Sequence, residues 1–251
     1  MSKNTYDFIT TGGGKLYIAT YNSDGTKNPL TYFGVTDNVT ISQSAEYLTK
    51  PDTEGKVQGT AKKVLKKREV TLKFATSEIS PKMLGLALNG KVGTISQSAQ
   101  TGVSVTLTGV KKGGVYSVGY SNLENVSIDS KVEGTDYAVD YLAGTIEILQ
   151  DGSINDGDDV SVTFDVKAFE GGSVEAFTEG QVEAELIFVS APLVGSKYRY
   201  TFFKVSISAD GDIDLKSDDF AVLGFSGSVL SINQTDANLS SYFRVEELPA
   251  N

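Results

Sequence analysis

The 251-residue chain contains no histidine and no cysteine. Their absence excludes cysteine nucleophiles, Ser-His triads, zinc sites built from His or Cys, haem ligation through His, and disulfide bonds. The fold must therefore be held by packing and hydrogen bonds, which suits a protein that matures in a reducing cytoplasm. Tryptophan is absent as well, which argues against a carbohydrate-binding site built on indole stacking.

Long apolar runs and a cationic excess are also missing. The N-terminal stretch has no apolar segment of the kind found in secretory signals, and no apolar run is long enough to span a membrane. Neither a secretory signal nor a membrane-spanning segment is therefore expected. The formal net charge is −10, from 22 Lys and Arg against 32 Asp and Glu. Because nucleic-acid binding depends on cations that neutralise phosphates, the chain as a whole is not expected to bind nucleic acid.

The residues that are present indicate β-structure. Glycine is abundant, with 26 residues, proline is scarce, with five, and Val, Ile, Thr, Tyr and Phe recur in short runs between turn residues. This composition is typical of an all-β protein with many turns. We predict an all-β fold with one short helix, in one large or two modest domains.

Alternation of apolar and polar residues predicts strands along most of the chain. The first two form a hairpin around Asp24-Gly25, and six short strands between 103 and 168 are typical of a sandwich of immunoglobulin-like size. Linkers at 90–102 and 170–173 are predicted to flank these six strands. The predicted strands are 15–21, 30–36, 39–42, 103–110, 115–120, 123–128, 136–142, 144–149, 158–168, 181–189, 198–208, 212–215, 219–225 and 228–232, with weaker alternation at 241–248. Phe203, Val205 and Ile207 give one of them a clean apolar face.

The stretch 62–90 is the most informative part of the sequence. Val70, Leu72 and Phe74 alternate with polar residues, as in a half-buried strand. From 62 to 68 the alternation fails, because strict period-2 spacing puts cations on both faces. Lys62, Lys66 and Arg68 fall on one face, and Lys63 and Lys67 on the other. Such a strand has no core of its own to cover, so it lies in solvent or against another molecule.

A short helix is predicted directly after this strand. Ser80 suits the N-cap and Pro81 the first helical position, and Gly90 stands just past the end. The apolar face is predicted to consist of Leu84, Ala87 and Leu88, with Met83 beside them. At about nine residues the helix is too short to be stable alone, so this face should cover an edge or open end of a sheet.

Residues 44–61 are mostly polar, contain Pro51 and two glycines, and show no sustained periodicity. They are predicted to form a long loop, which together with the cationic strand makes a protruding arm. We expect this arm to meet an acidic surface of a neighbouring subunit, with acids such as Glu183, Glu185 or those at 210–219. A DNA-binding patch and a merely solvated strand are the alternatives. The predicted contact residues are Glu46, Tyr47, Lys50, Asp52, Glu54, Lys56, Lys62, Lys63, Lys66, Lys67 and Arg68.

No catalytic, metal or cofactor site is predicted. The acids at 151–159 have the spacing of a calcium loop, but Asp156 replaces the required glycine and Val162 the bidentate glutamate. In the cluster at 210–214, Leu215 replaces the glycine in the same way. Ordinary Asp/Gly turns are expected at both places. Gly12-Gly13-Gly14 opens no helix, and nothing in the sequence positions a pair of carboxylates for glycoside hydrolysis.

The order of these elements resembles that of the major tail tube proteins of long-tailed phages. The resemblance covers most of residues 15–92 and 180–248. It rests on FGVTDNVTISQSAEYL, the polar segment 44–61, REVTLKFATSE, ISPKMLGLALNG, AELIFVSAP, and YRYTFFKVSISADGDIDLKSDDFAVLGFSGSVL.

Membership of that family would imply a β-sandwich of two packed sheets and a flanking helix. Six subunits would form a ring whose inner sheets close into a β-barrel, and stacked rings would form the tail tube. The partners implied are further copies of the chain and the tape-measure, tail-terminator and distal tail proteins, with DNA passing through the lumen unbound. The chain would be made in the host cytoplasm and reside in the virion tail. Residues 1–92 and 173–251 would form the tube core, and 93–172 an inserted immunoglobulin-like module.

The sequence also fits two other functional classes of protein. A bacterial surface or capsid-decoration module predicts stable monomers or trimers and does not need the long polar segment. A carbohydrate-active β-sandwich predicts convergent acids beside exposed aromatic residues in one cleft.

Overall fold

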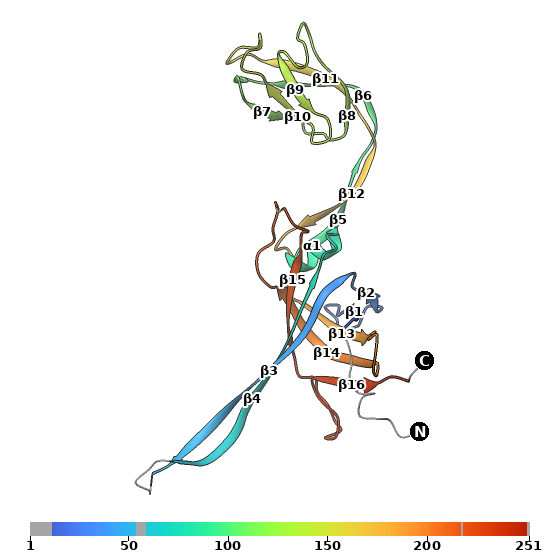
Figure 1. Cartoon of the computed structure of the whole chain (residues 1–251). Helices are drawn as coiled ribbons and strands as arrows, with labels where there is room; N and C mark the ends of the chain where they lie inside the picture. The colour runs from blue at the N-terminus through green and yellow to red at the C-terminus, as the bar shows by residue number, and fades with distance from the viewer. Residues whose placement is uncertain (1–11, 54–58, 217, 250–251) are drawn as a thin grey trace. The chain divides into compact units, whose positions relative to one another are not determined.

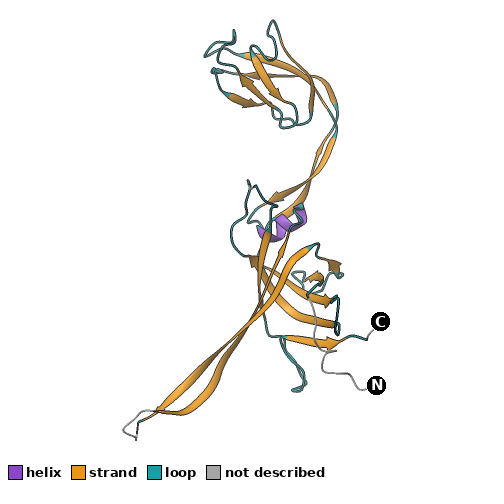
Figure 2. Cartoon of the chain, viewed as in Figure 1, coloured by secondary structure: helices purple, strands orange, loops and turns teal. Residues whose placement is uncertain are grey.

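The computed structural model describes residues 12–53, 59–216 and 218–249, which form antiparallel β-sheets and, within these ranges, a single short helix (Figures 1 and 2). The chain divides into two compact units. We call Met1–Val92 together with Val174–Asn251 the core unit, and Gly93–Ser173 the inserted unit. The all-β prediction with one helix is confirmed. Within the described ranges, no helix is long and apolar enough to cross a membrane.

The core unit contains one eight-stranded sheet with the strand order β2-β1-β13-β14-β15-β4-β3, and β16 pairs with the first half of β14. Alternate residues of these strands point into a single apolar core. The strands are β1 (Gly14–Thr20), β2 (Thr31–Tyr32), β3 (Thr36–Asp52), β4 (Gly59–Thr76), β13 (Val182–Ser190), β14 (Tyr198–Ala209), β15 (Leu223–Val229) and β16 (Phe243–Glu247).

Three aromatic rings show that this sheet curls around its core. Phe33 follows β2 near one end of the strand order, yet its ring lies 5.1 Å from that of Phe74 in β4 and 5.5 Å from that of Phe225 in β15. The rings of Phe74 and Phe225 stack on each other at 5.3 Å. Among the described strands the sheet does not close into a barrel, because its strand order runs from β2 to β3 without returning.

Helix α1 (Pro81–Ala87) packs against β14 and β15. Its predicted start is confirmed, since Ser80 Oγ accepts a hydrogen bond from the Met83 amide and Pro81 is the first helical residue. Met83 and Ala87 are buried and Leu84 is half-buried against the core, whereas Leu88 is only half-buried, so the buried side of the helix centres on Met83 and Ala87. The helix ends through Asn89, which has a φ of 45° and takes the position that the sequence suggested for Gly90.

A bulge in β14 corrects one position of the predicted apolar face of that strand: Val205 and Ile207 are buried as predicted, but Phe203 is only half-buried. Ala184 lies opposite Val205, but Leu186 lies opposite Phe202, so β14 carries one extra residue between these pairs. Phe202 is consequently fully buried in the core, where strict alternation had placed Phe203. Period-2 spacing does not reveal a bulge, and every side chain beyond it changes face.

Several predicted elements of the core unit have different bounds. The second strand of the first hairpin shrinks to Thr31–Tyr32, and the strand predicted at 39–42 is part of β3. No strand forms at 212–215. The two strands predicted at 219–225 and 228–232 are one, β15, which pairs with both β14 and β4 and therefore has a single continuous register.

The inserted unit has two three-stranded sheets, β7-β10-β9 and β6-β11-β8, around its own apolar core. Its six strands overlap the six predicted ones. They are β6 (Gln100–Leu107), β7 (Val115–Ser117), β8 (Leu123–Ile128), β9 (Tyr137–Asp140), β10 (Thr145–Ile148) and β11 (Val160–Val166).

The segments predicted as linkers form strands instead. β5 (Lys91–Gln97) and β12 (Phe169–Glu175) pair as a two-stranded ribbon through which the chain enters and leaves the inserted unit. Almost all of their residues are exposed or half-exposed. Their Gly, Ser and Thr content resembles that of a linker because no face of the ribbon covers a core.

Candidate assembly surface

The outer part of hairpin β3–β4 lies beyond the other strands of the sheet. β15 pairs with β4 only from Thr71 to Thr76, and farther out β4 pairs with β3 alone among the described strands. We call residues 44–52 and 59–69 the arm. All of them are exposed, and Figure 1 shows the two strands continuing together past the rest of the sheet. A lone two-stranded hairpin is marginally stable in water, so the arm is suited to lie against a partner.

The predicted long loop at 44–61 is therefore wrong. Residues 44–52 and 59–61 are strand, and 54–58 lie outside the described residues. The reason is that neither face of the arm covers a core, so the sequence lacks the apolar alternation by which a strand is recognised. Backbone pairing alone makes these residues a strand.

A β-bulge interrupts the arm. Glu46 lies opposite Lys67, but Tyr47 lies opposite Leu65, so Lys66 is an extra residue on β4. Since directly opposite residues share a face of an antiparallel pair, the bulge changes the phase of β4 relative to the core.

This change of phase corrects the predicted distribution of cations. The sequence placed Lys62, Lys66 and Arg68 on one face and Lys63 and Lys67 on the other. In the structure Lys63 shares the face of Arg68, and Lys62 shares the face of Lys67. Both faces still carry cations, as predicted, but each contains a different set.

Two apolar pairs lie next to each other just beyond the bulge. Tyr47 is opposite Leu65 on the core-side face, and Leu48 is opposite Val64 on the other face. The four side chains are between 39 and 58% exposed. A hairpin with apolar side chains on both faces gains most when both faces are covered. Apolar alternation along the sequence does not mark these pairs, although their symmetric positions about Lys56 reveal them once a hairpin is assumed.

Two cations of the arm are paired within it. Lys66 Nζ lies 2.6 Å from Glu46 Oε1, and Lys67 forms an ion pair with Glu69. The hydrogen bond from Lys67 lowers the pKa of Glu69 and raises that of Lys67. All four side chains are about half exposed, so neither pair adds much stability.

The remaining cations of the arm do not form ion pairs with described acidic side chains. Lys63 Nζ lies 4.2 Å from the centre of the Tyr47 ring, in a cation–π contact. Lys50 and Lys62 lie directly opposite each other, and like charges in that position are destabilising. Neither they nor Arg68 forms an ion pair with another described residue. The arm thus carries cations whose counter-charges do not lie on the arm itself.

The structure brings the described members of the predicted contact set onto one hairpin. Glu54 and Lys56 lie outside the described residues. The other members lie on β3 (Glu46, Tyr47, Lys50, Asp52) or β4 (Lys62, Lys63, Lys66, Lys67, Arg68).

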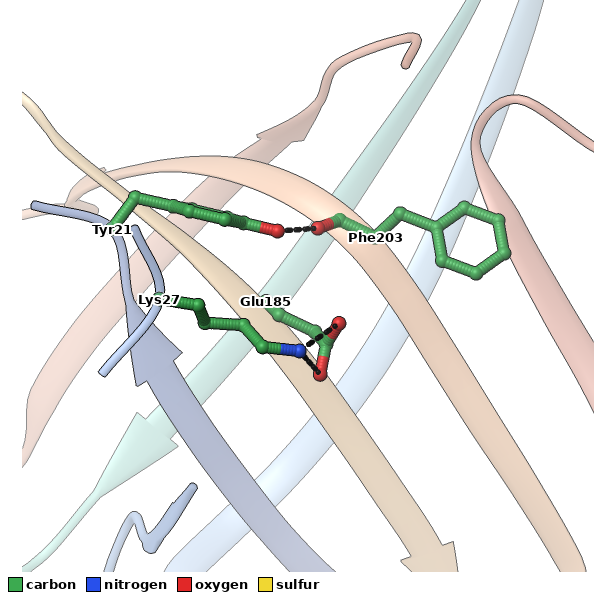
Figure 3. Close-up of polar contacts among 4 residues, drawn as sticks. All are labelled: Tyr21, Lys27, Glu185 and Phe203. Atoms are coloured by element: carbon green, nitrogen blue, oxygen red, sulfur yellow. Dashed lines mark hydrogen bonds and ion pairs between the residues drawn. The ribbon is translucent and has the colours of Figure 1, made fainter. Parts of the chain in front are cut away.

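Three of the acids expected to receive the arm are already paired within the chain. The pairs are Glu183–Lys204 at 2.7 Å, Glu185–Lys27 at 3.0 Å and Asp210–Lys73 at 2.7 Å. Figure 3 shows Lys27 contacting both carboxylate oxygens of Glu185. Beside them the Tyr21 hydroxyl donates to the Phe203 carbonyl, which lies at the bulge of β14. These acids therefore serve the core unit's own packing.

The acids at 151–159 also have structural roles. Asp156, Asp158 and Asp159 each accept a hydrogen bond from a backbone amide, those of Lys112, Asn155 and Gly109. Among the described residues no three Asp or Glu side chains converge as a metal site would require.

An open groove of about 1110 Å³ lies in the core unit between the 20–31 turn, α1 and the segment before β13. Its acidic lining residues are Glu179 and Glu183, of which Glu183 is paired with Lys204. The groove lacks the pair of unengaged carboxylates that glycoside hydrolysis uses.

A model of the family described as "Protein of unknown function UCP028589" matches residues 9–246. A search of curated proteins finds no match to the chain.

Proposed function

The chain belongs to the UCP028589 family of proteins of unknown function, and from its geometry we propose that it is a self-assembling structural protein, the tube subunit of a phage tail. The observation that supports this most is the arm. It is a long exposed hairpin with apolar side chains on both faces and cations that lack partners on it. Such a hairpin is stabilised by contact with neighbouring copies of the same chain.

The open sheet of the core unit agrees with this proposal. Its strand order ends at β3, whose outer edge pairs with no described strand along Thr36–Asp52. Exposed edges of this length invite pairing with another chain, and a ring of subunits that completes a shared barrel would cover them. The curled shape of the sheet makes it suitable as one segment of such a barrel.

The distribution of charge bears on how DNA would pass through such a tube. Twelve of the 32 Asp and Glu lie in the inserted unit, but only four of the 22 Lys and Arg. The core unit is therefore nearly neutral, and a tube wall built from it would neither attract nor strongly repel DNA. The inserted unit, a small two-sheet module that we assign to the immunoglobulin-like class, carries most of the negative charge.

Removal of the arm tests the proposal. Ala45 and Arg68 lie opposite each other, so residues 46–67 can be replaced by an Asn-Gly turn without disturbing the core. The purified full chain at high concentration should form hollow tubes or rings of uniform diameter in negative-stain electron microscopy. The shortened chain should remain folded, with cooperative thermal unfolding, but should form no tubes by microscopy or by analytical ultracentrifugation.

Two results would contradict the proposal. Stable monomers or trimers of the full chain at all concentrations would favour a decoration or surface-binding module. Tubes of normal length from the shortened chain would show that the arm has no part in assembly.

A further inference from the structure

The arm and an acidic loop emerge at opposite ends of the same pair of strands. β4 runs from the arm to Thr76, and Leu223, the first residue of β15, lies opposite Thr76. The connection between β14 and β15 therefore lies at the end of the sheet that is farthest from the arm (Figure 1). We call residues 210–216 and 218–222 the acidic loop.

The acidic loop carries negative charges that complement the cations of the arm. It contains five aspartates and one lysine. Asp210 is paired with Lys73, whereas Asp212, Asp214 and Asp218 form no ion pair with a described residue. Among these acids Leu215 is 95% exposed and Phe220 is 91% exposed. Large apolar side chains exposed to this extent among charges are typical of a contact surface.

We infer that the acidic loop of one copy receives the arm of the next copy, so that the chains stack head to tail along the strand direction. The inference rests on the proposed self-assembly and specifies its axial contact. Arg68 on the core-side face of the arm, and Lys50 and Lys62 on the other face, would pair with aspartates on either side of the hairpin. Tyr47 and Leu65, which share the face of Arg68, would pack against Leu215 and Phe220. Because the two surfaces differ and lie at opposite ends of the unit, the contact is heterologous and repeats without closing.

Reversal of charge on each surface tests the inference. The arm variant is Lys50→Glu, Lys62→Glu and Arg68→Glu, and the loop variant is Asp212→Lys, Asp214→Lys and Asp218→Lys. None of these side chains forms an ion pair with a residue that the structure describes, so both variants should fold. A matched control changes the net charge as the loop variant does, through Asp129→Lys, Glu147→Lys and Asp151→Lys in the inserted unit, all at exposed positions.

Each reversal alone should raise the critical concentration for assembly by about tenfold or more, and the chain that carries both should recover assembly near the original concentration. The control should assemble as the unchanged chain does. Normal assembly of the loop variant, with the arm variant defective, would overturn the acceptor but leave self-assembly standing. Failure of the unchanged chain to assemble would refute the proposed function and this contact together.

A cross-link gives an independent readout, because the chain has no cysteine of its own. Tyr47→Cys and Leu215→Cys chains, mixed under oxidising conditions, should form a disulfide-linked pair much faster than Tyr47→Cys mixed with Leu142→Cys of the inserted unit. Equal rates would overturn the contact. Arm variants that lose affinity for a short DNA duplex while assembling normally would also overturn it, in favour of a nucleic-acid role.

Discussion

At the scale of single residues, Gly144 shows how tightly the inserted unit is built. It has a φ of +67°, and a Cβ at this position would lie 1.6 Å from the Tyr120 carbonyl oxygen. Gly144→Ala should therefore cost about 1 kcal/mol for the left-handed backbone and a further ~1–3 kcal/mol for the clash. Thermal or urea unfolding of the variant would measure this loss.

Gly134 provides the matched control. Its φ is +81°, but a Cβ there would meet no atom within 4 Å. Gly134→Ala should lose only the backbone contribution of about 1 kcal/mol. Equal losses at the two positions would show that the segment at Tyr120 moves aside without cost.

Asp136 gives the inserted unit an acid-sensitive component. Its carboxylate accepts hydrogen bonds from the amides of Ser153 at 2.7 Å and Val132 at 2.8 Å, and these bonds lower its pKa. A carboxylate with a lowered pKa stabilises the fold above its unfolded pKa of about 3.9, and this contribution is lost as the pH falls through the folded pKa. Asp136→Asn should reduce stability at neutral pH and flatten its decline below about pH 4.

Hydrogen exchange at the Val132 and Ser153 amides, with melting temperatures from pH 7 to 2, would measure this effect. Asp129→Asn is the control, because it removes one carboxylate from an exposed position of the same unit and should change the pH profile less than Asp136→Asn does. A parallel pH profile for Asp136→Asn and the unchanged chain would contradict the prediction.

At the scale of elements, the ribbon β5–β12 predicts that the inserted unit is separable. The two units have distinct apolar cores, and a Cβ on Gly93 would lie 3.0 Å from Ser173 Oγ, so the ends of the insertion adjoin. Joining Val92 to Val174 through Asn-Gly should leave a folded core unit. Residues 93–173 expressed alone should also fold.

Calorimetry would check this expectation. The full chain should show two transitions, and each separated unit should reproduce one of them within a few degrees. An unfolded or aggregated core unit after excision would show that the ribbon and the inserted unit stabilise it.

The sequence predicted elements well where one face covers a core. Val70, Leu72 and Phe74 alternate because the sheet buries one side of β4, and Ser80 and Pro81 fix the start of α1 through local chemistry. It failed where no core is covered, as in the arm and the ribbon, since pairing there depends on backbone hydrogen bonds that any side chain permits. It also failed at the bulges, because one extra residue reverses the faces of everything beyond it.

The sequence predicted which residues make up the candidate contact surface, but not how they pair or on which face of the hairpin they lie. The failure of alternation at 62–68 identified the arm's cations, and they all lie on one hairpin. The sequence did not show which acids are already paired, because Lys27–Glu185 and Lys204–Glu183 join segments that are neighbours only in the folded chain.

At the scale of the whole molecule, the two ends of the core unit and the inserted unit carry different charges. The arm has an excess of cations, the loop at 210–222 an excess of acids, and the inserted unit most of the remaining negative charge. In the proposed assembly, attraction between arm and loop would favour stacking, whereas repulsion between inserted units would oppose close association of many copies. Both terms are screened by salt, with a Debye length of about 10 Å at 0.1 M and about 3 Å at 1 M.

These opposed terms predict different salt responses for two chains. In the full chain, added salt weakens stacking but also relieves repulsion between inserted units, so the critical concentration should change little. In the chain that lacks 93–173, only the attraction remains, and the critical concentration should rise several-fold between 0.05 and 0.5 M salt, by an order-of-magnitude estimate from screening. Light scattering of both chains over this range would measure the slopes. Equal slopes would show that the inserted units do not repel one another during assembly, and that their charge serves another purpose.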